Sequence, residues 1–112
     1  MIVFNTTRNI AVVSRAVKAD SFRTRLFGLI PRRTMEQEEG LWLAPCAMIH
    51  SCFMSFPIDA VFLDAGLKVM KVVPFLKPWR FSPWVYGAAG VLELAPGRAG
   101  SVLAEGELLE FR

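Results

Sequence analysis

Residues 57–73 read PIDAVFLDAGLKVMKVV, two apolar runs separated by the short stretch LDAGLK. The runs are rich in Val, Phe and Ile, which are enriched in β-strands. A glycine between two such runs is typical of a tight turn. We therefore predict a β-hairpin here, with Gly66 supplying the positive φ of the turn.

Similar short apolar runs extend from this hairpin in both directions. MIVF and IAVVSRAV flank the turn signal NTTRN and predict an opening hairpin, and LWLAPCAMIHSCFM precedes the central one. VLEL and ELLEF predict further strands near the C-terminus. Residues 73–84, VPFLKPWRFSPW, hold three prolines. We predict a loop there, because proline cannot take part in a central ladder.

One segment changes to helical spacing. Phe22, Leu26 and Leu29 recur at intervals of three to four residues, and Asp20 or Ser21 can cap a helix that begins there. GRAGSVLAEG predicts a further helical turn. The expected fold is mainly β, a β-sandwich or barrel-like arrangement of about seven or eight short strands. One short α-helix packs on the sheet. We expect one domain over residues 1–112.

Composition excludes several classes of protein. Hydrophobic residues make up 54% of the chain, so a disordered chain is excluded. The net charge of +3 falls short of the dense Lys/Arg stripe of a nucleic-acid binder. Residues 40–58 contain no Lys, Arg, Asp or Glu, but prolines interrupt them, so we predict no membrane span. No signal peptide is visible, which predicts a cytoplasmic protein with reduced cysteines.

A run of possible soft-metal ligands occupies even positions: Cys46, Met48, His50, Cys52 and Met54. On a continuous strand they would line one face, about 6–7 Å from one to the next. The outer ligands would then lie too far apart to share an ion, and Cys and Met also serve as ordinary core residues. We predict no metal and no cofactor.

Two carboxylates stand inside apolar strands, where a charge is costly unless it is paired. They are Asp59 and Glu93, and Arg25 on the predicted helix is a possible partner for Asp59. One interpretation is a buried ionic network that fixes the helix on the sheet. The alternative is a pocket in which His50, Asp59 and Glu93 converge, either to hold a ligand or to transfer protons.

The proline-rich loop is also rich in aromatic residues, with Lys77 and Arg80 between them: Phe75, Trp79, Phe81, Trp84 and Tyr86. Such a loop either folds back as a lid over the core or presents its rings to a partner. Exposure of the rings would favour interaction.

The central block resembles a known family. It contains Gly-Leu-Trp, Pro-Cys, Ile-His, Met-x-Phe-Pro-Ile-Asp and Phe-Leu-Asp, with Val-Leu-Glu-Leu later in the chain. Together with the upstream RLFGLIPR, these motifs resemble the domain of unknown function 192 family over roughly residues 8–112. The resemblance implies a compact, mainly β domain with a helix and implies no established reaction.

We therefore expect a binding module for a small molecule or a protein partner. The predicted ligand-binding residues are His50, Asp59, Glu93, Arg25, Trp79 and Trp84. Two alternatives stay open. One is a small enzyme that uses His50 with Asp59 or Glu93, and the other is a protein-interaction domain that uses the aromatic loop 74–86.

Overall fold

The computed structural model describes residues 1–19, 34–52 and 54–112. These residues form eight strands and one short helix, in the order β1 (Val3–Asn5), β2 (Ile10–Val13), β3 (Arg15–Lys18), β4 (Glu39–Leu43), β5 (Ile58–Leu63), β6 (Val69–Leu76), β7 (Gly90–Leu94), α2 (Arg98–Val102) and β8 (Leu109–Phe111). The mainly β prediction is confirmed, as are the opening hairpin and the late helical turn. The helix predicted over residues 22–29 lies outside the described residues.

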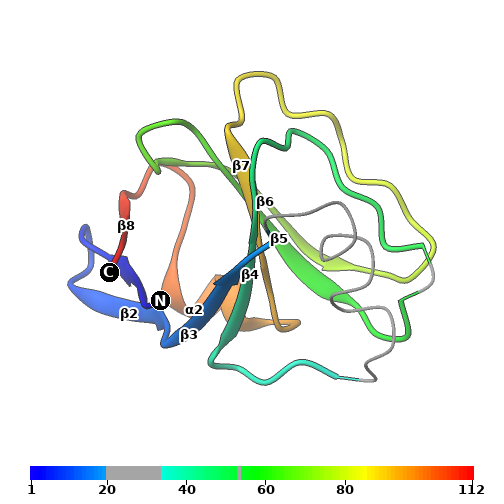
Figure 1. The fold of residues 1–112 in the computed structure, drawn as a ribbon, viewed down its shortest axis with the longest axis horizontal. Coiled ribbons are helices and arrows are strands. Elements are labelled where there is room, and N and C mark those ends of the chain that lie inside the picture. The colour runs from blue at the N-terminus through cyan, green and yellow to red at the C-terminus, as the bar shows by residue number, and fades with distance from the viewer. Residues whose placement is uncertain (20–33, 53) are drawn as a thin grey trace.

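The strands form two sheets (Figure 1). The smaller has the order β2-β1-β8, and the larger has the order β3-β4-β7-β5-β6. All neighbours are antiparallel except β3 and β4, which are parallel. An isolated bridge pairs Lys68, just before β6, with Leu108, just before β8. The described strands form no closed barrel.

The central strands of the larger sheet, β4, β7 and β5, are buried on both faces, and β5 is buried at every position. The inner face of the sheet packs on the smaller sheet and on α2, with core residues Val3, Val12, Val13, Trp42, Val61, Leu63, Leu92, Leu94, Ala99, Val102 and Leu109. Its outer face holds a second cluster that includes Leu41, Leu43, Ile58, Ala60, Phe62 and Val91. Because side chains alternate along each strand, the same strands contribute residues to two cores, one on each face of the sheet.

The central hairpin forms as predicted, but its turn differs in detail. Leu67, with φ of 66°, occupies the left-handed position, and the prediction of a positive φ at Gly66 is wrong. The side chain of Asp64 explains the turn. Its Oδ1 accepts the backbone N–H groups of Gly66 and Lys68, both at 2.9 Å.

Two predicted boundaries are also wrong. The predicted loop at Val73 begins later, because β6 continues through Pro74 to Leu76. Proline is tolerated there because β6 is an edge strand with a register shift opposite residues 58–60. The described residues between β4 and β5, 44–52 and 54–57, form no continuous strand. The five possible ligands therefore share no single face, since His50 is exposed whereas Met54 is buried.

Candidate functional site

Residues 44–52 and 54–57 on one side, and residues 77–89 on the other, form two loops that run side by side (Figure 1). We call them the paired loops. Five backbone hydrogen bonds join them: Cys46 N–H to Ala89 O, Val85 N–H to Ala47 O, Ser82 N–H to Ile49 O, Ser51 N–H to Arg80 O, and Trp79 N–H to Ser51 O, at 3.2, 2.9, 2.9, 2.9 and 3.1 Å. An isolated bridge between His50 and Phe81 completes the pattern. The two loops thus behave as an irregular antiparallel ribbon.

The inner side of the ribbon is part of the core. Ile49, Met54, Phe56 and Val85 are buried in the outer cluster of the larger sheet. The apolar residues of the paired loops therefore cover this face. Of the aromatic loop 74–86, only Leu76 and Val85 belong to this cluster, and none of the five aromatic rings does.

Two buried serines fasten the ribbon. The Ser51 Oγ donates to the carbonyl of Lys77 and accepts the N–H of Arg80 at 3.0 Å. The Ser82 Oγ accepts the N–H of Ile49 at 2.9 Å and donates to the carbonyl of Pro83 at 3.0 Å. Buried hydroxyls that are fully hydrogen-bonded fix the backbone around them.

The outer side of the ribbon presents aromatic rings. Four residues are largely exposed: Trp79 at 56%, Phe81 at 67%, Trp84 at 68% and Tyr86 at 91%. We call these four the aromatic ridge. The exposed ring of His50 lies beside Phe81, with 5.9 Å between ring centroids. Phe75 is also exposed, but its ring lies near Gly97, just before α2. A Cβ atom added to Gly97 would lie 3.8 Å from the tip of the Phe75 ring.

Trp79 has a backbone conformation that is unusual for a bulky residue. Its φ is 62°, in the left-handed region, which costs of order 1–3 kcal/mol for such a residue. The surrounding hydrogen bonds to Ser51 hold the turn of residues 77–80 in place. The ridge is therefore a constrained feature of the fold.

The charge of the paired loops has a single sign. Neither loop contains Asp or Glu, and Lys77 and Arg80, which flank Trp79 in the sequence, are both exposed. The Arg80 Nη1 donates to the carbonyl of Trp79 at 3.3 Å. The ribbon thus combines large apolar rings with cations.

Asp59 lies on the inner face of the larger sheet and is completely buried. Its Oδ1 accepts the N–H of Phe75 at 3.0 Å, and its Oδ2 accepts the N–H of Ala99 at 3.0 Å. The first bond holds the irregular end of β6, and the second caps the first turn of α2. In the structure Asp59 therefore joins three elements.

Glu93 lies on the outer face of the same sheet, between Leu41 of β4 and Ala60 of β5. It is only 6% exposed. Burial raises the pKa of this carboxyl to about 8. Within the described part of the chain, no hydrogen bond reaches the carboxyl, so the neutral form is favoured in its apolar surroundings.

The predicted ligand-binding residues are therefore spread over several places. Asp59 and Glu93 face opposite sides of the larger sheet, and His50 is exposed on the paired loops. The structure does bring His50, Trp79 and Trp84 onto one ribbon. Arg25 lies outside the described residues. The sequence reasoning missed the buried serines, since a serine beside prolines carries no distinctive signal.

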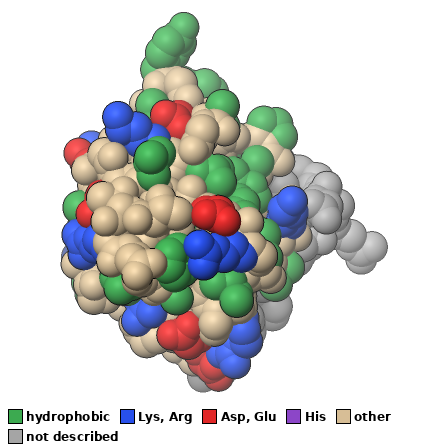
Figure 2. Space-filling view, turned by 90° about the vertical axis from the view of Figure 1, so that its left-hand side faces the viewer, with side chains coloured by type: hydrophobic (Ala, Val, Ile, Leu, Met, Phe, Trp, Pro, Cys, Tyr) green, Lys and Arg blue, Asp and Glu red, His purple; other side chains and the backbone are tan. Residues whose placement is uncertain are grey.

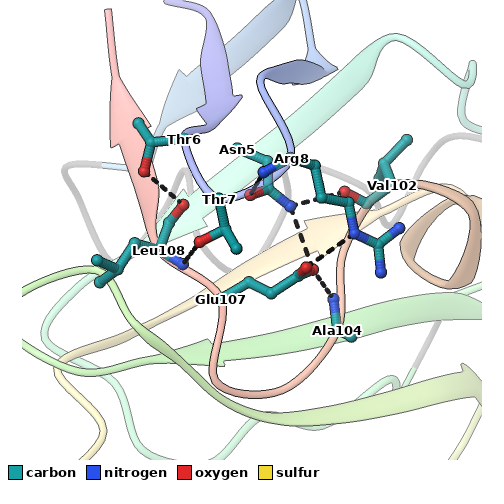
Figure 3. Close-up of polar contacts among 8 residues, drawn as sticks. All are labelled: Asn5, Thr6, Thr7, Arg8, Val102, Ala104, Glu107 and Leu108. Atoms are coloured by element: carbon teal, nitrogen blue, oxygen red, sulfur yellow. Dashed lines mark hydrogen bonds and ion pairs between the residues drawn. The ribbon is translucent and has the colours of Figure 1, made fainter.

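A separate polar cluster surrounds Glu107 (Figure 3). Its carboxylate accepts from Arg8 Nε at 2.8 Å, from Asn5 Nδ2 at 3.3 Å and from the Ala104 N–H at 2.6 Å. The hydrogen bond from Arg8 is the main reason that the pKa of Glu107 lies below its usual value. Asn5 also donates to the carbonyl of Val102 at 2.9 Å. These contacts fasten the β1–β2 turn to the segment before β8.

Over residues 1–19, 34–52 and 54–112, no group of three His, Cys, Asp or Glu side chains is arranged to hold a metal ion. In the same residues, no helix has the length and apolar character needed to cross a bilayer.

Comparison with known proteins supports the fold. The chain is similar to UPF0127 protein PH1112 of Pyrococcus horikoshii, with 36% identity over 81 residues, 70% of each chain. The structure matches a Novosphingobium aromaticivorans protein of unknown function, with a TM-score of 0.83 and 23% identity, over 98% of this chain and 82% of that one. It also matches a Sinorhizobium meliloti protein described as a "putative transcription regulator", with a TM-score of 0.80 and 20% identity, over 97% of this chain and 89% of that one.

The family resemblance seen in the motifs holds over nearly the whole length. The sequence model of the DUF192 family, described as an uncharacterized ACR, matches residues 3–111. The chain therefore belongs to the DUF192 family.

Proposed function

We propose that this domain is a binding module whose recognition surface is the aromatic ridge. The observation that carries the proposal is the exposure of four aromatic rings on a backbone that buried serines hold in place. Exposed groups of large apolar side chains commonly mark interaction sites. Trp and Tyr in particular supply much of the binding energy at interfaces.

The rigidity of the ribbon also supports binding. A loop that is already ordered loses little conformational entropy when a ligand covers it. The hydrogen bonds of Ser51 and Ser82 constrain the backbone that carries Trp79, Phe81 and Trp84. The rings are thus presented before any ligand arrives.

The geometry favours this reading over acid–base catalysis. General acid–base catalysis needs groups within hydrogen-bond reach of one substrate. Asp59 is engaged by two backbone N–H groups on one face of the sheet, and Glu93 is buried on the other. Neither shares a surface with the exposed ring of His50.

The test is site-specific photo-crosslinking in the cells that naturally make the protein. Phe81 is replaced by p-benzoylphenylalanine in one variant, and Val17 in the matched control. Val17 is 59% exposed on the edge strand β3 and so has comparable access to solvent. We expect a defined adduct, with protein or lipid, from position 81 alone. Equal labelling from both positions, or none from position 81, would overturn the proposal.

A further inference from the structure

We infer that the aromatic ridge, with Lys77 and Arg80, docks on an anionic membrane surface. This inference rests on the proposed function and names the ligand of the same surface. It concerns attachment to the interface and involves no crossing of the bilayer.

The residue types of the ridge suit the interface between water and lipid. Trp and Tyr have a broad apolar ring and a polar group, and they are enriched at the headgroup level of membranes. Tyr86 at 91% and Trp84 at 68% exposure protrude from the ribbon. A protein partner would need a shaped pocket for each protruding ring, whereas a fluid interface accepts all of them.

The charge of the paired loops complements anionic lipid. Lys77 precedes Trp79 and Arg80 follows it, both are exposed, and neither loop carries a carboxylate that would be repelled. Each Lys or Arg close to such a surface contributes about 1 kcal/mol of attraction. Protein interfaces, in contrast, are depleted in lysine at their centres.

The side of the molecule that carries the smaller sheet has charges of both signs. Figure 2 shows the face over the smaller sheet, where acidic and basic side chains are interspersed. The acidic residues there include Glu107 and Glu110, which are ion-paired with Arg8 and Arg112. The field of the molecule would therefore favour approach through the paired loops.

The hydrogen bonding of the ribbon sets the depth of docking. Polar backbone groups without partners cost several kcal/mol in hydrocarbon. In the paired loops, many backbone N–H and C=O groups bond to the other loop or to the hydroxyls of Ser51 and Ser82. The rings can thus enter the headgroup layer while the backbone stays paired.

The test uses the purified full chain with two kinds of vesicle. One kind is phosphatidylcholine alone, and the other contains about one third phosphatidylserine. Cosedimentation measures binding, and tryptophan emission reports the environment of Trp79 and Trp84, because Trp42 is already buried. We expect binding to the anionic vesicles, with a blue shift of the emission, and weaker binding to phosphatidylcholine.

Two double variants locate the site. Trp84→Ala with Tyr86→Ala should weaken binding to anionic vesicles at least roughly tenfold, because both rings are lost from the interface. Lys77→Gln with Arg80→Gln should weaken binding to the anionic vesicles roughly 10- to 30-fold, and should not change binding to phosphatidylcholine vesicles. The matched control, Lys18→Gln with Lys68→Gln, removes two exposed cations elsewhere and should bind as the wild type does. All replaced residues are exposed, and circular dichroism checks that each variant is folded.

The outcomes separate the two proposals. If vesicles are not bound and position 81 crosslinks to a protein, the membrane inference is wrong and the ridge is still a recognition surface. If vesicles are not bound and position 81 forms no adduct, both are wrong. Vesicle binding that is equal in the wild type and the Trp84/Tyr86 variant would also overturn the membrane inference.

Discussion

Asp59 and Glu93 sit one register position apart on neighbouring strands and therefore face opposite sides of one sheet. Asp59 pairs across the ladder with Leu94, and Glu93 pairs with Ala60. Directly opposed residues share a face, and the next pair points the other way. A single residue of offset thus separates two carboxylates that look equivalent in the sequence.

Replacing Asp59 should destabilise the domain through its backbone partners. In Asp59→Ala the N–H groups of Phe75 and Ala99 lose their acceptors, and we expect the free energy of unfolding to fall by roughly 2–4 kcal/mol. Urea unfolding at neutral pH measures this change. Asp59→Asn keeps one acceptor oxygen and should lose less. A change below roughly 1 kcal/mol in the alanine variant would contradict this role.

Glu93 should make stability decrease as pH rises. Its ordinary pKa of 4.5 describes the unfolded chain, and burial raises the folded pKa to about 8. Between these values the folded state holds a proton that the unfolded state has lost, so unfolding becomes easier with rising pH. The stabilisation is complete below pH 4.5 and is lost by about pH 8.

Urea unfolding across this pH range measures the effect. The difference in the free energy of unfolding between the wild type and Glu93→Gln should change by up to roughly 4 kcal/mol between pH 5 and pH 8. The contributions of all other titrating groups are common to both proteins and cancel in this difference. Glu110→Gln replaces an exposed carboxylate and serves as the control. Parallel curves for the wild type and Glu93→Gln would show that Glu93 carries no such linkage.

For single residues, the sequence predicts that burying a carboxylate is costly, but it does not predict which groups will bind that carboxylate. Asp59 and Glu93 both stand out because they interrupt apolar runs. The two hydrogen-bond donors to Asp59 are backbone N–H groups. Every residue except proline carries such a group, so the sequence does not indicate which of them will bind the carboxylate.

At the scale of elements, the two sides of the paired loops differ. Their inner side covers the outer core, and their outer side bears the aromatic ridge. Exposure of the rings could not be predicted, because it depends on Ser82 and Val85 turning inward between exposed neighbours. The three prolines of residues 73–84 indicate a loop, but the path of that loop is set by its backbone hydrogen bonds to residues 47–51.

Ser51→Ala should loosen the paired loops without removing any ring. The variant leaves the N–H of Arg80 and the carbonyl of Lys77 without their hydroxyl partner. We expect a loss of about 1–3 kcal/mol in the free energy of unfolding and faster amide exchange at Arg80. Ser55→Ala, at an exposed position of the same loop, should change neither. Unchanged exchange at Arg80 would show that the hydroxyl does not fasten the ribbon.

At the scale of the whole molecule, the number of strands follows from the sequence and their arrangement does not. Short apolar runs with turn signals between them indicate strands. The order β3-β4-β7-β5-β6 includes the parallel pair β3–β4, which depends on long-range packing that no local pattern encodes. The inner core joins both sheets, so we expect residues 1–112 to act as one domain.

Trp42 offers a direct test of this expectation. It belongs to β4 of the larger sheet, and its ring meets the ring of Phe111 in β8 of the smaller sheet edge-on, with centroids 5.1 Å apart. In a Trp79→Phe, Trp84→Phe background, Trp42 is the only tryptophan, and its emission reports the contact between the sheets.

We expect urea to give one transition in this variant, with the same midpoint by Trp42 emission and by far-ultraviolet circular dichroism. A shared core makes separation of the sheets and loss of strands a single cooperative event. Both replaced residues are exposed, so the background should keep nearly the stability of the wild type. A Trp42 signal that changes at lower urea than the dichroism would mean that the smaller sheet detaches first, and the one-domain expectation would then be wrong.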